Sequence, residues 1–364
     1  MNKLVKKTLP EQIADILREE IRQSCAPGQL FPADAELTKR FGVSSLTLRA
    51  AINILAREGH LERAQGRRSI VKSRTAPGRH VAILSNKDLS LSPVSFFRLR
   101  TIQRLSRNLD AVGIPCKVYS GKGSPEAANV EQAYPEDFMR DVEAGTLSAV
   151  LAVNSTPATD WLEPLERNGV PVVGGGVPYQ YQVVHDAYGL SLMAVKHFLD
   201  KGKRRIAMMG WGGDLLFQGK TIDTLKREAA KLMTTRKTVL PPEWFKYEDY
   251  PVAPGAGWRN LHAIWNARKE KPDALVIADD MLVPDTVNAL LSLGVKIPEQ
   301  LDVAVQFTLG SGLFLPCAAD LLQIDADTHA DAMTDMLKAL LRGERPEPPL
   351  VVPPITLAHR PFNQ

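Results

Sequence analysis

The sequence predicts a small α+β domain at the N-terminus followed by a larger α/β body with parallel sheets. In the first part, apolar residues recur at helical spacing. From residue 80 onward, short apolar runs typical of buried strands alternate with helical patterns. The segment between them contains Pro77 and Gly78 and is too short to form an element of its own. We therefore predict one domain over 1–73, a linker over 74–79 and a second domain over 80–364.

The first helix is expected to begin at Thr8, where Glu11 three residues later completes a capping box. Its apolar residues fall at spacings that predict one buried stripe. The stripe comprises Ile13, Ile16, Leu17 and Ile21.

Two further helices joined by a tight turn are predicted over 34–41 and 44–58. Gly42 supplies the left-handed residue that ends the first of them, and Ser44 is a good N-cap for the second. The second helix has one apolar face, which predicts a second buried stripe. This stripe comprises Leu48, Ala51, Ile52 and Leu55.

A short hairpin follows, with strands over 61–63 and 69–71 and a basic tip between them. Three helices and a hairpin in this order predict a winged helix-turn-helix, whose second helix of the pair enters the major groove of DNA. The exposed face of that helix carries small polar groups and one arginine, and the hairpin tip carries two guanidinium groups. The predicted DNA-binding residues are Ser44, Ser45, Leu46, Thr47, Arg49, Gln65, Gly66, Arg67 and Arg68.

The charge distribution agrees with a nucleic-acid partner for the first domain. Residues 1–73 hold 13 lysines and arginines against 8 acidic residues, a net charge of +5. The whole chain carries +4, so the remainder carries −1. Positive charge is therefore concentrated where DNA would bind.

A run of spaced residues over roughly 8–72 resembles the N-terminal domain of the GntR family of bacterial transcription regulators. The matching residues are Pro32, Glu36-Leu37, Phe41-Gly42-Val43-Ser44, Thr47-Leu48-Arg49, Leu55, Glu58-Gly59 and Gln65-Gly66-Arg67. The resemblance implies sequence-specific DNA binding. The family often has arginine at the positions of Ala35 and Ser45, so its operator does not transfer to this chain. We expect Leu46 to contact a thymine methyl group.

In the body, alternating strands and helices predict parallel sheets with helices on both faces. Strands are expected over 80–85, 115–119, 148–153, 170–173, 205–209, 274–278 and 303–307. Helices are expected over 96–112, 135–144, 161–167, 190–200, 222–233, 258–267 and 284–293. The body is too long for one such unit, which predicts two lobes with a cleft between them.

The body resembles the effector-binding domain of the LacI family, which has a periplasmic-binding-protein-like fold. The matching residues are His185-Asp186, Gly189, 194–198, 202–206, 274–280, Leu290, Gly294, Pro298, 302–307, 340–344 and 350–354. A GntR-type head on a LacI-type body is similar to the arrangement of arabinose-type repressors. The resemblance implies a first lobe of 80–183 and 323–346, and a second of 184–322 and 347–364.

Ligands of open α/β lobes bind at the carboxyl ends of the strands. The predicted effector-binding residues are Ser85, Asn86, Phe96, Asn154, Trp211, Lys220, Asp279, Phe307 and Thr308. Amides and carboxylates suit sugar hydroxyls and an aromatic ring suits the apolar sugar face, so we expect a carbohydrate. The family usually has an acidic residue at the position of Thr308 and an arginine near the position of Lys220. An uncharged effector or a body that no longer responds to ligand is therefore an alternative.

Other classes of function have little support in the sequence. No apolar run reaches the length of a membrane span, and no signal peptide is present, which favours a cytoplasmic protein. The three cysteines and seven histidines form no ligand motif, so neither a metal nor a cofactor is expected. An α/β enzyme is the competing class, but no catalytic motif supports it. An architectural DNA-binding protein without a ligand is a third class. We predict a ligand-responsive repressor that binds a palindromic operator as a homodimer.

Overall fold

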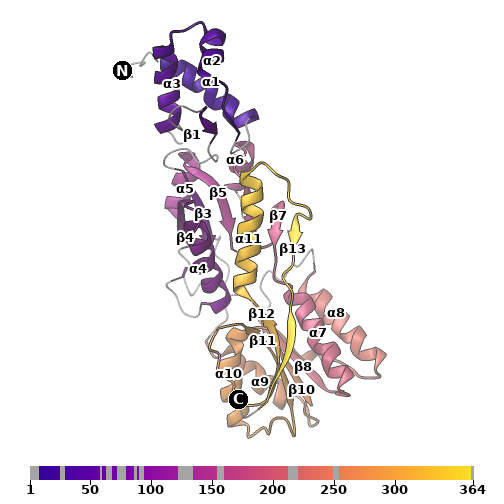
Figure 1. Ribbon diagram of the computed structural model, residues 1–364. Helices are drawn as coiled ribbons and strands as arrows, with labels where there is room; N and C mark the ends of the chain where they lie inside the picture. The colour runs from indigo at the N-terminus through magenta and orange to yellow at the C-terminus, as the bar shows by residue number, and fades with distance from the viewer. Residues whose placement is uncertain are drawn as a thin grey trace.

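The structure is a computed structural model that describes residues 8–24, 29–57, 60–62, 68–71, 79–85, 88–89, 94–121, 134–153, 160–211, 220–248 and 254–361. Three parts follow one another along an elongated molecule (Figure 1). The N-terminal head lies at one end, a first sheet with its helices lies in the middle, and a second sheet lies at the far end. We refer to the two sheet-containing parts as lobe 1 and lobe 2.

The head contains the three predicted helices and the predicted hairpin. Its elements are α1 (Leu9–Ser24), α2 (Asp34–Phe41), α3 (Ser45–Arg57), β1 (Leu61–Glu62) and β2 (Ile70–Val71). Gly42 has a φ of 63° and ends α2 as predicted. The whole apolar face of α3 is buried in one core with α1, α2 and both strands, so the predicted helical stripe is confirmed.

Two details of the head differ from the prediction. Ile16 is 48% exposed, whereas Ala14 is buried in the core beside Ile13 and Leu17. The buried face of α1 therefore includes Ala14 and leaves out Ile16. Leu30 also forms an isolated β-bridge with Ile70 of the hairpin, which the sequence did not predict. The capping box is present, with Glu11 accepting a hydrogen bond of 2.6 Å from the backbone N–H of Thr8.

Lobe 1 is built on a six-stranded parallel sheet in the order β4-β3-β5-β6-β7-β13. Its elements are β3 (His80–Ser85), α4 (Phe96–Asp110), β4 (Cys116–Ser120), α5 (Glu136–Glu143), β5 (Leu147–Ala152), α6 (Leu162–Arg167), β6 (Val172–Gly174), β7 (Tyr181–Val183), α11 (Ala326–Leu341) and β13 (Leu350–Val351). The central strands are buried on both faces, as the continuous apolar runs predicted.

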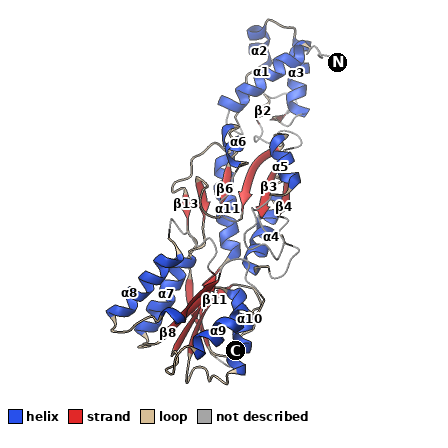
Figure 2. Cartoon of the chain, turned by 180° about the vertical axis from the view of Figure 1, so that it is seen from behind, coloured by secondary structure: helices blue, strands red, loops and turns tan. Residues whose placement is uncertain are grey.

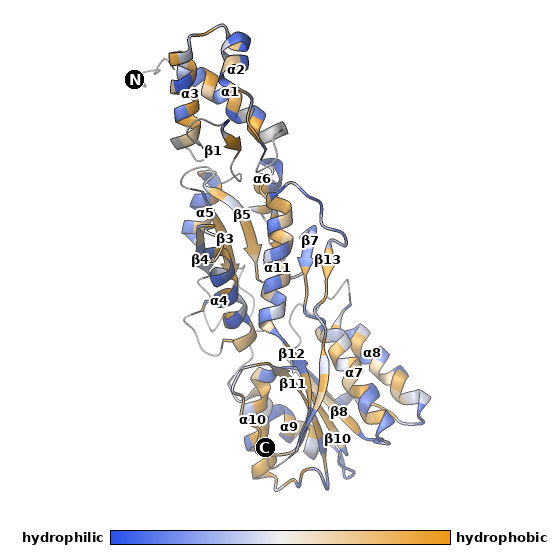
Figure 3. Ribbon diagram, viewed as in Figure 1, coloured by the Kyte–Doolittle hydropathy of each residue, from blue (hydrophilic) through white to orange (hydrophobic). Residues whose placement is uncertain are grey.

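Lobe 2 is built on a second six-stranded sheet in the order β9-β8-β10-β11-β12-β14, in which only β14 is antiparallel. Its elements are α7 (Ala187–Asp200), β8 (Ile206–Trp211), α8 (Ile222–Thr235), the 3-10 turn η1 (Pro242–Trp244), β9 (Phe245–Glu248), α9 (Ala256–Asn266), β10 (Ala274–Ile277), the 3-10 turn η2 (Asp280–Leu282), α10 (Val283–Ser292), β11 (Asp302–Thr308), β12 (Ala319–Ile324) and β14 (Thr356–Arg360). Helices lie on both faces of the sheets, and the strands themselves are mainly hydrophobic (Figures 2 and 3).

The chain passes between the lobes three times. It leaves lobe 1 after β7, returns after β12 at Asp325, and leaves again after β13. The predicted limits at 323 and 347 are wrong by a few residues. Gln323 and Ile324 pair with β11 in lobe 2, and Leu350 and Val351 pair with β7 in lobe 1. Short strand ends carry little sequence signal, which explains these shifts. Of the predicted linker, only Arg79 lies among the described residues.

A buried carboxylate ties the first helix of lobe 2 to two strands of its sheet. Asp320 on β12 accepts hydrogen bonds of 2.7 Å from His197 of α7 and from His359 of β14, and one of 3.0 Å from Lys201. Burial alone would raise the pKa of Asp320, but these donors outweigh it and lower the pKa. The ionised carboxylate therefore stabilises the folded lobe at neutral pH.

Replacing Asp320 by asparagine is expected to lower the free energy of unfolding by about 1.5 kcal/mol, because charge-assisted hydrogen bonds are lost while the side-chain size is kept. Urea denaturation at pH 7 measures the change. The exposed pair of Arg167 and Glu163 provides the control, since Glu163→Gln should have almost no effect. Equal stability of Asp320→Asn and the wild type would contradict this assignment.

Candidate nucleic-acid interface and effector site

The N-terminal turn of α3 presents a small surface to solvent. The Oγ atom of Ser44 accepts a hydrogen bond of 3.2 Å from the backbone N–H of Thr47, so Ser44 is the predicted N-cap. The two hydroxyl groups also lie 2.9 Å apart and bind one another. Ser45 is exposed beside them, and Leu46 is 80% exposed. Leucine at such exposure, on a helix N-terminus that favours phosphate, is suited to contact a base edge in a groove.

Arg49 extends the same surface by one turn. Its side chain is exposed and has no ion pair within the described part of the chain, whereas Arg40 on α2 is held by Glu20 of α1. Of the predicted wing residues, Arg68 is exposed, and Gln65, Gly66 and Arg67 lie outside the described residues. Leu61 and Val71 anchor the wing in the head core.

Arg49→Ala is expected to weaken DNA binding about tenfold, because a guanidinium contact to the phosphate backbone is lost from each recognition helix. If Arg49 contacts only phosphate, affinity falls equally for all sequences and the salt dependence becomes shallower. Fluorescence anisotropy with several duplexes over a range of salt concentrations measures both. Lys39→Ala on α2, an exposed residue outside the predicted surface, is the control. Unchanged affinity of Arg49→Ala would contradict this contact.

The two sheets point their carboxyl ends at one another. The carboxyl end of β7 in lobe 1 leads directly into α7 of lobe 2, and that of β12 in lobe 2 leads through Asp325 into α11 of lobe 1. Because the neighbouring strands run parallel, their carboxyl ends share these edges. The predicted effector residues at strand ends therefore lie on the facing edges of the two lobes.

Several of the predicted residues lie on these facing edges. Ser85 ends β3 and is fully buried, and Phe96 begins α4 and is half-buried. Trp211 and Phe307 are half-buried at the ends of β8 and β11 and also pack against the core of lobe 2. Asn86 and Asn154 lie outside the described residues.

Lys220 is exposed just before α8, and its amino group lies 5.4 Å from the ring centre of Tyr188 in the first turn of α7. A cation above an aromatic face is a stabilising arrangement in its own right. This contact gives Lys220 a structural partner besides the predicted ligand.

Two adjacent carboxylates follow β10 at this edge. Asp279 accepts a hydrogen bond of 2.8 Å from the backbone N–H of Met281, so it is Asp279 and not Asp280 that caps the following turn. Thr308 is fully buried and donates a hydrogen bond of 2.5 Å to Asp280. Thr308 thus positions a carboxylate rather than offering exposed surface of its own.

Burial and the neighbouring charge of Asp280 raise the pKa of Asp279 to about 7, and Arg98 of α4 in lobe 1 acts in the opposite direction. Burial likewise raises the pKa of Asp280 against its hydrogen bonds. A carboxyl group that titrates near neutral pH and faces a guanidinium of the other lobe can either accept or donate a hydrogen bond to a polar ligand.

Sequence reasoning missed a group of rings that joins the lobes. The ring of Phe97 on α4 lies 5.7 Å from that of His185, which is in the first crossing, and 5.2 Å from that of His329 on α11. His185 in turn lies 3.4 Å from Gln306 on β11. Burial lowers the pKa of both histidines. The only signal in the sequence was the place of His185 in the resemblance to the LacI family.

No helix in the described part of the chain is long and apolar enough to span a membrane. Within the same residues, no cluster of three or more histidine, cysteine or carboxylate side chains could hold a metal ion.

Two family profiles match separate parts of the chain. The family described as bacterial regulatory proteins, gntR family, matches residues 9–71, and the periplasmic binding protein-like domain matches residues 195–361. The arabinose metabolism transcriptional repressor of Halalkalibacterium halodurans is 23% identical over 305 residues, which cover 79% of this chain and 78% of that protein. The mannosyl-D-glycerate transport/metabolism system repressor MngR of Escherichia coli is 42% identical over 67 residues, 18% of this chain and 28% of that protein.

Solved structures with the same fold match most or nearly all of the chain. A regulatory protein of the LacI family from Chloroflexus aggregans superposes with a TM-score of 0.62 at 15% sequence identity. The match covers 78% of this chain and 98% of that protein's chain. A transcriptional regulator CelR–cellobiose complex has a TM-score of 0.60 at 16% identity over 97% of this chain and 98% of that one. The chain therefore joins a head that matches the gntR family of bacterial regulatory proteins to a body that matches the periplasmic binding protein-like domain.

Proposed function

We propose that this chain is a repressor whose affinity for its operator is changed by a carbohydrate bound between the two lobes. The observation that carries the proposal is the facing arrangement of the two carboxyl edges below a DNA-binding head. A ligand held by both edges would fix the angle between the lobes, and that angle is transmitted to the head through lobe 1.

The chemistry of the facing edges supports a polar, uncharged ligand. Asp279 offers carboxyl oxygens for hydroxyl groups, and the half-buried Trp211 and Phe307 offer aromatic rings for an apolar sugar surface. One of the related structures was solved as a complex with cellobiose, which supports the same class of ligand here. No residue of these edges is assigned a catalytic role.

We also propose that the chain acts as a homodimer on a palindromic operator. The exposed large apolar side chains of lobe 2 include Leu291 at 68%, Leu309 at 40% and Phe314 at 73%. Exposed leucine and phenylalanine on one lobe support an interface with a second copy. A dimer would place two α3 helices on two half-sites. Such a regulator would act in the cytoplasm.

A thermal-shift screen of the full chain tests the effector proposal. The compounds are mono- and disaccharides, sugar acids and nucleosides. A ligand that binds only the folded state raises the melting temperature by mass action, so a sugar is expected to give a concentration-dependent rise. The same sugar should give a smaller rise with Asp279→Ala. No rise with any sugar would contradict a carbohydrate effector and favour an unresponsive body.

A further inference from the structure

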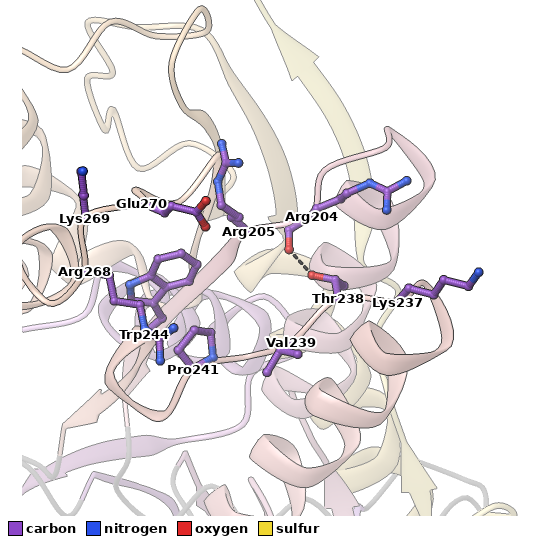
Figure 4. Close-up of a pocket in the computed structure, with 10 residues that line it drawn as sticks. All are labelled: Arg204, Arg205, Lys237, Thr238, Val239, Pro241, Trp244, Arg268, Lys269 and Glu270. Carbon is purple, nitrogen blue, oxygen red and sulfur yellow. Dashed lines mark hydrogen bonds between the residues drawn. The ribbon is translucent and has the colours of Figure 1, made fainter.

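A second candidate binding site lies at the opposite end of lobe 2 from the lobe interface. A cavity of about 550 Å³ is lined there by Arg204, Arg205, Lys237, Thr238, Val239, Pro241, Trp244, Arg268, Lys269 and Glu270 (Figure 4). Arg204 and Arg205 immediately precede β8, so the cavity is at the amino ends of the strands. None of the predicted effector residues lines it. This cavity is therefore separate from the proposed effector site.

The cavity is strongly basic although the body as a whole is not. Five of its lining side chains are cationic and one is a carboxylate, whereas residues 74–364 carry a net charge of −1. Clustered like charges repel one another and raise the free energy of the unliganded state. An anion bound among them would relieve that repulsion, so the composition of the cavity indicates an anionic ligand.

Three of the five cations have no ion pair within the described residues. Arg268 donates to Glu243 at 2.6 Å, and Arg205 lies 3.8 Å from Asp273 and donates to the carbonyl oxygen of Lys271 at 2.8 Å. No such partner occupies the charged groups of the other three, which are Arg204, Lys237 and Lys269. In Figure 4 Arg204 and Lys237 extend on one side of the cavity, and Lys269 lies on the opposite side. Arg204 and Lys237 are therefore the pair available to bind one phosphate group.

The framework around the cavity is fixed by backbone hydrogen bonds. The carboxylate of Asp273 accepts from the backbone N–H of Arg205 at 2.8 Å and of Arg204 at 3.3 Å. The hydroxyl of Thr238 donates to the carbonyl oxygen of Arg204, which joins the end of α8 to the start of β8. Because these bonds use backbone groups, they hold the chain in place while leaving the side chain of Arg204 free.

Lys237 has a backbone conformation that normally favours glycine. Its φ is 56°, and it is the one non-glycine residue of the described chain with a positive φ. It follows α8 in a Schellman motif, in which Lys237 N–H donates to Thr234 at 3.0 Å and Thr238 N–H donates to Met233 at 3.1 Å. Glycine would adopt this conformation without strain. A lysine here costs stability, which a role for its side chain in the cavity would explain.

The cavity wall also contains a buried donor without an acceptor. Trp244 is 3% exposed, and its indole N–H has no hydrogen-bond partner among the described residues. A buried polar group without a partner is unusual and calls for a functional or structural reason.

We propose that this cavity binds a small phosphate-bearing molecule, with Arg204 and Lys237 holding the phosphate group. The phosphate is the chemistry that the site recognises, and it can be carried by a sugar or by a nucleoside. This site is distinct from the effector site and from the DNA-binding surface, so its test does not depend on either of them.

Isothermal titration calorimetry of the full chain with pyrophosphate, glucose 6-phosphate and AMP tests the proposal. At least one of these probes is expected to give saturable binding that weakens about tenfold in Lys237→Gly and in Arg204→Gln, because each removes a charge-assisted contact. Tighter binding of glucose 6-phosphate or of AMP than of pyrophosphate would identify a sugar or a nucleoside as the carrier. Equal binding of all three would identify the phosphate group alone.

Two controls separate binding from folding and from general charge. Lys237→Gly is expected to leave the melting temperature unchanged or higher, since glycine suits the left-handed position. Lys231→Ala removes an exposed cation from α8, the helix before Lys237, and Lys231 does not line the cavity. This variant should bind as the wild type does. The proposal is overturned if no probe binds, or if Lys237→Gly and Arg204→Gln bind as tightly as Lys231→Ala.

Discussion

Leu46→Ala is expected to weaken binding to the operator about a hundredfold while leaving the fold intact. Leu46 is 80% exposed at the first turn of α3, so its removal opens no cavity in the head core. In a dimer each substitution acts at two half-sites, and losing an apolar contact to a base costs about 1 to 3 kcal/mol at each. The predicted loss follows from these two contributions.

The loss of DNA affinity in Leu46→Ala should depend on the base that Leu46 contacts. If the side chain contacts a thymine methyl group, replacing that thymine by uracil weakens the wild type but hardly affects Leu46→Ala. Anisotropy titrations with the thymine and uracil duplexes measure this coupling. Ile16→Ala, which truncates an exposed apolar residue of α1, is the control and should bind normally. Equal uracil effects in the wild type and in Leu46→Ala would exclude the methyl contact.

His329→Leu is expected to remove much of the acid sensitivity that arises between the lobes. His329 is 3% exposed, its Nδ1 has no partner among the described residues, and burial followed by the nearby His185 lowers its pKa to about 3. In the unfolded chain the pKa of histidine is about 6.5. As the pH falls below 6.5, the unfolded state therefore takes up the proton first, and the folded state loses relative stability.

At pH 5 this difference amounts to about 2 kcal/mol for His329 alone. The wild type should therefore lose about 2 kcal/mol more than His329→Leu between pH 7 and pH 5, as measured by urea denaturation. Asp279 acts in the opposite direction, because an acid whose pKa is raised when folded stabilises the fold as the pH falls. That contribution is present in both proteins and cancels in the comparison. An equal loss in both would show that His329 is not held neutral by burial.

The head could be predicted almost completely from the sequence because its signals are local. The cap at Ser44, the left-handed Gly42 and the apolar face of α3 each determine structure within a few residues. The position of Ile16 could not be predicted, since helical spacing alone does not distinguish neighbouring faces of α1. The β-bridge between Leu30 and Ile70 could not be predicted either, because it joins residues forty positions apart.

The body could be predicted in class but not in its interfaces. Long buried strands such as β3 and β5 show as apolar runs, whereas the two-residue β13 is defined by its pairing with β7. The same limit applies to the sites. Strand ends can be located from the sequence, but the contact of Phe97 with His185 and His329 joins three separate segments. The basic cavity likewise combines the ends of α8 and α9 with the start of β8.

The most direct test of the proposed function has two steps. The full chain first selects the duplexes that it binds from a random DNA pool. The selected duplex is then titrated with the full chain, with and without the sugar found by thermal shift. The account predicts an inverted repeat with two half-sites, and a ligand that lowers the affinity for it about 5- to 150-fold, the usual range of allosteric coupling. The same ligand should have no effect on binding to an unrelated duplex. A pool without any enriched sequence, or an affinity for the selected duplex that the ligand leaves unchanged, would contradict a ligand-controlled repressor.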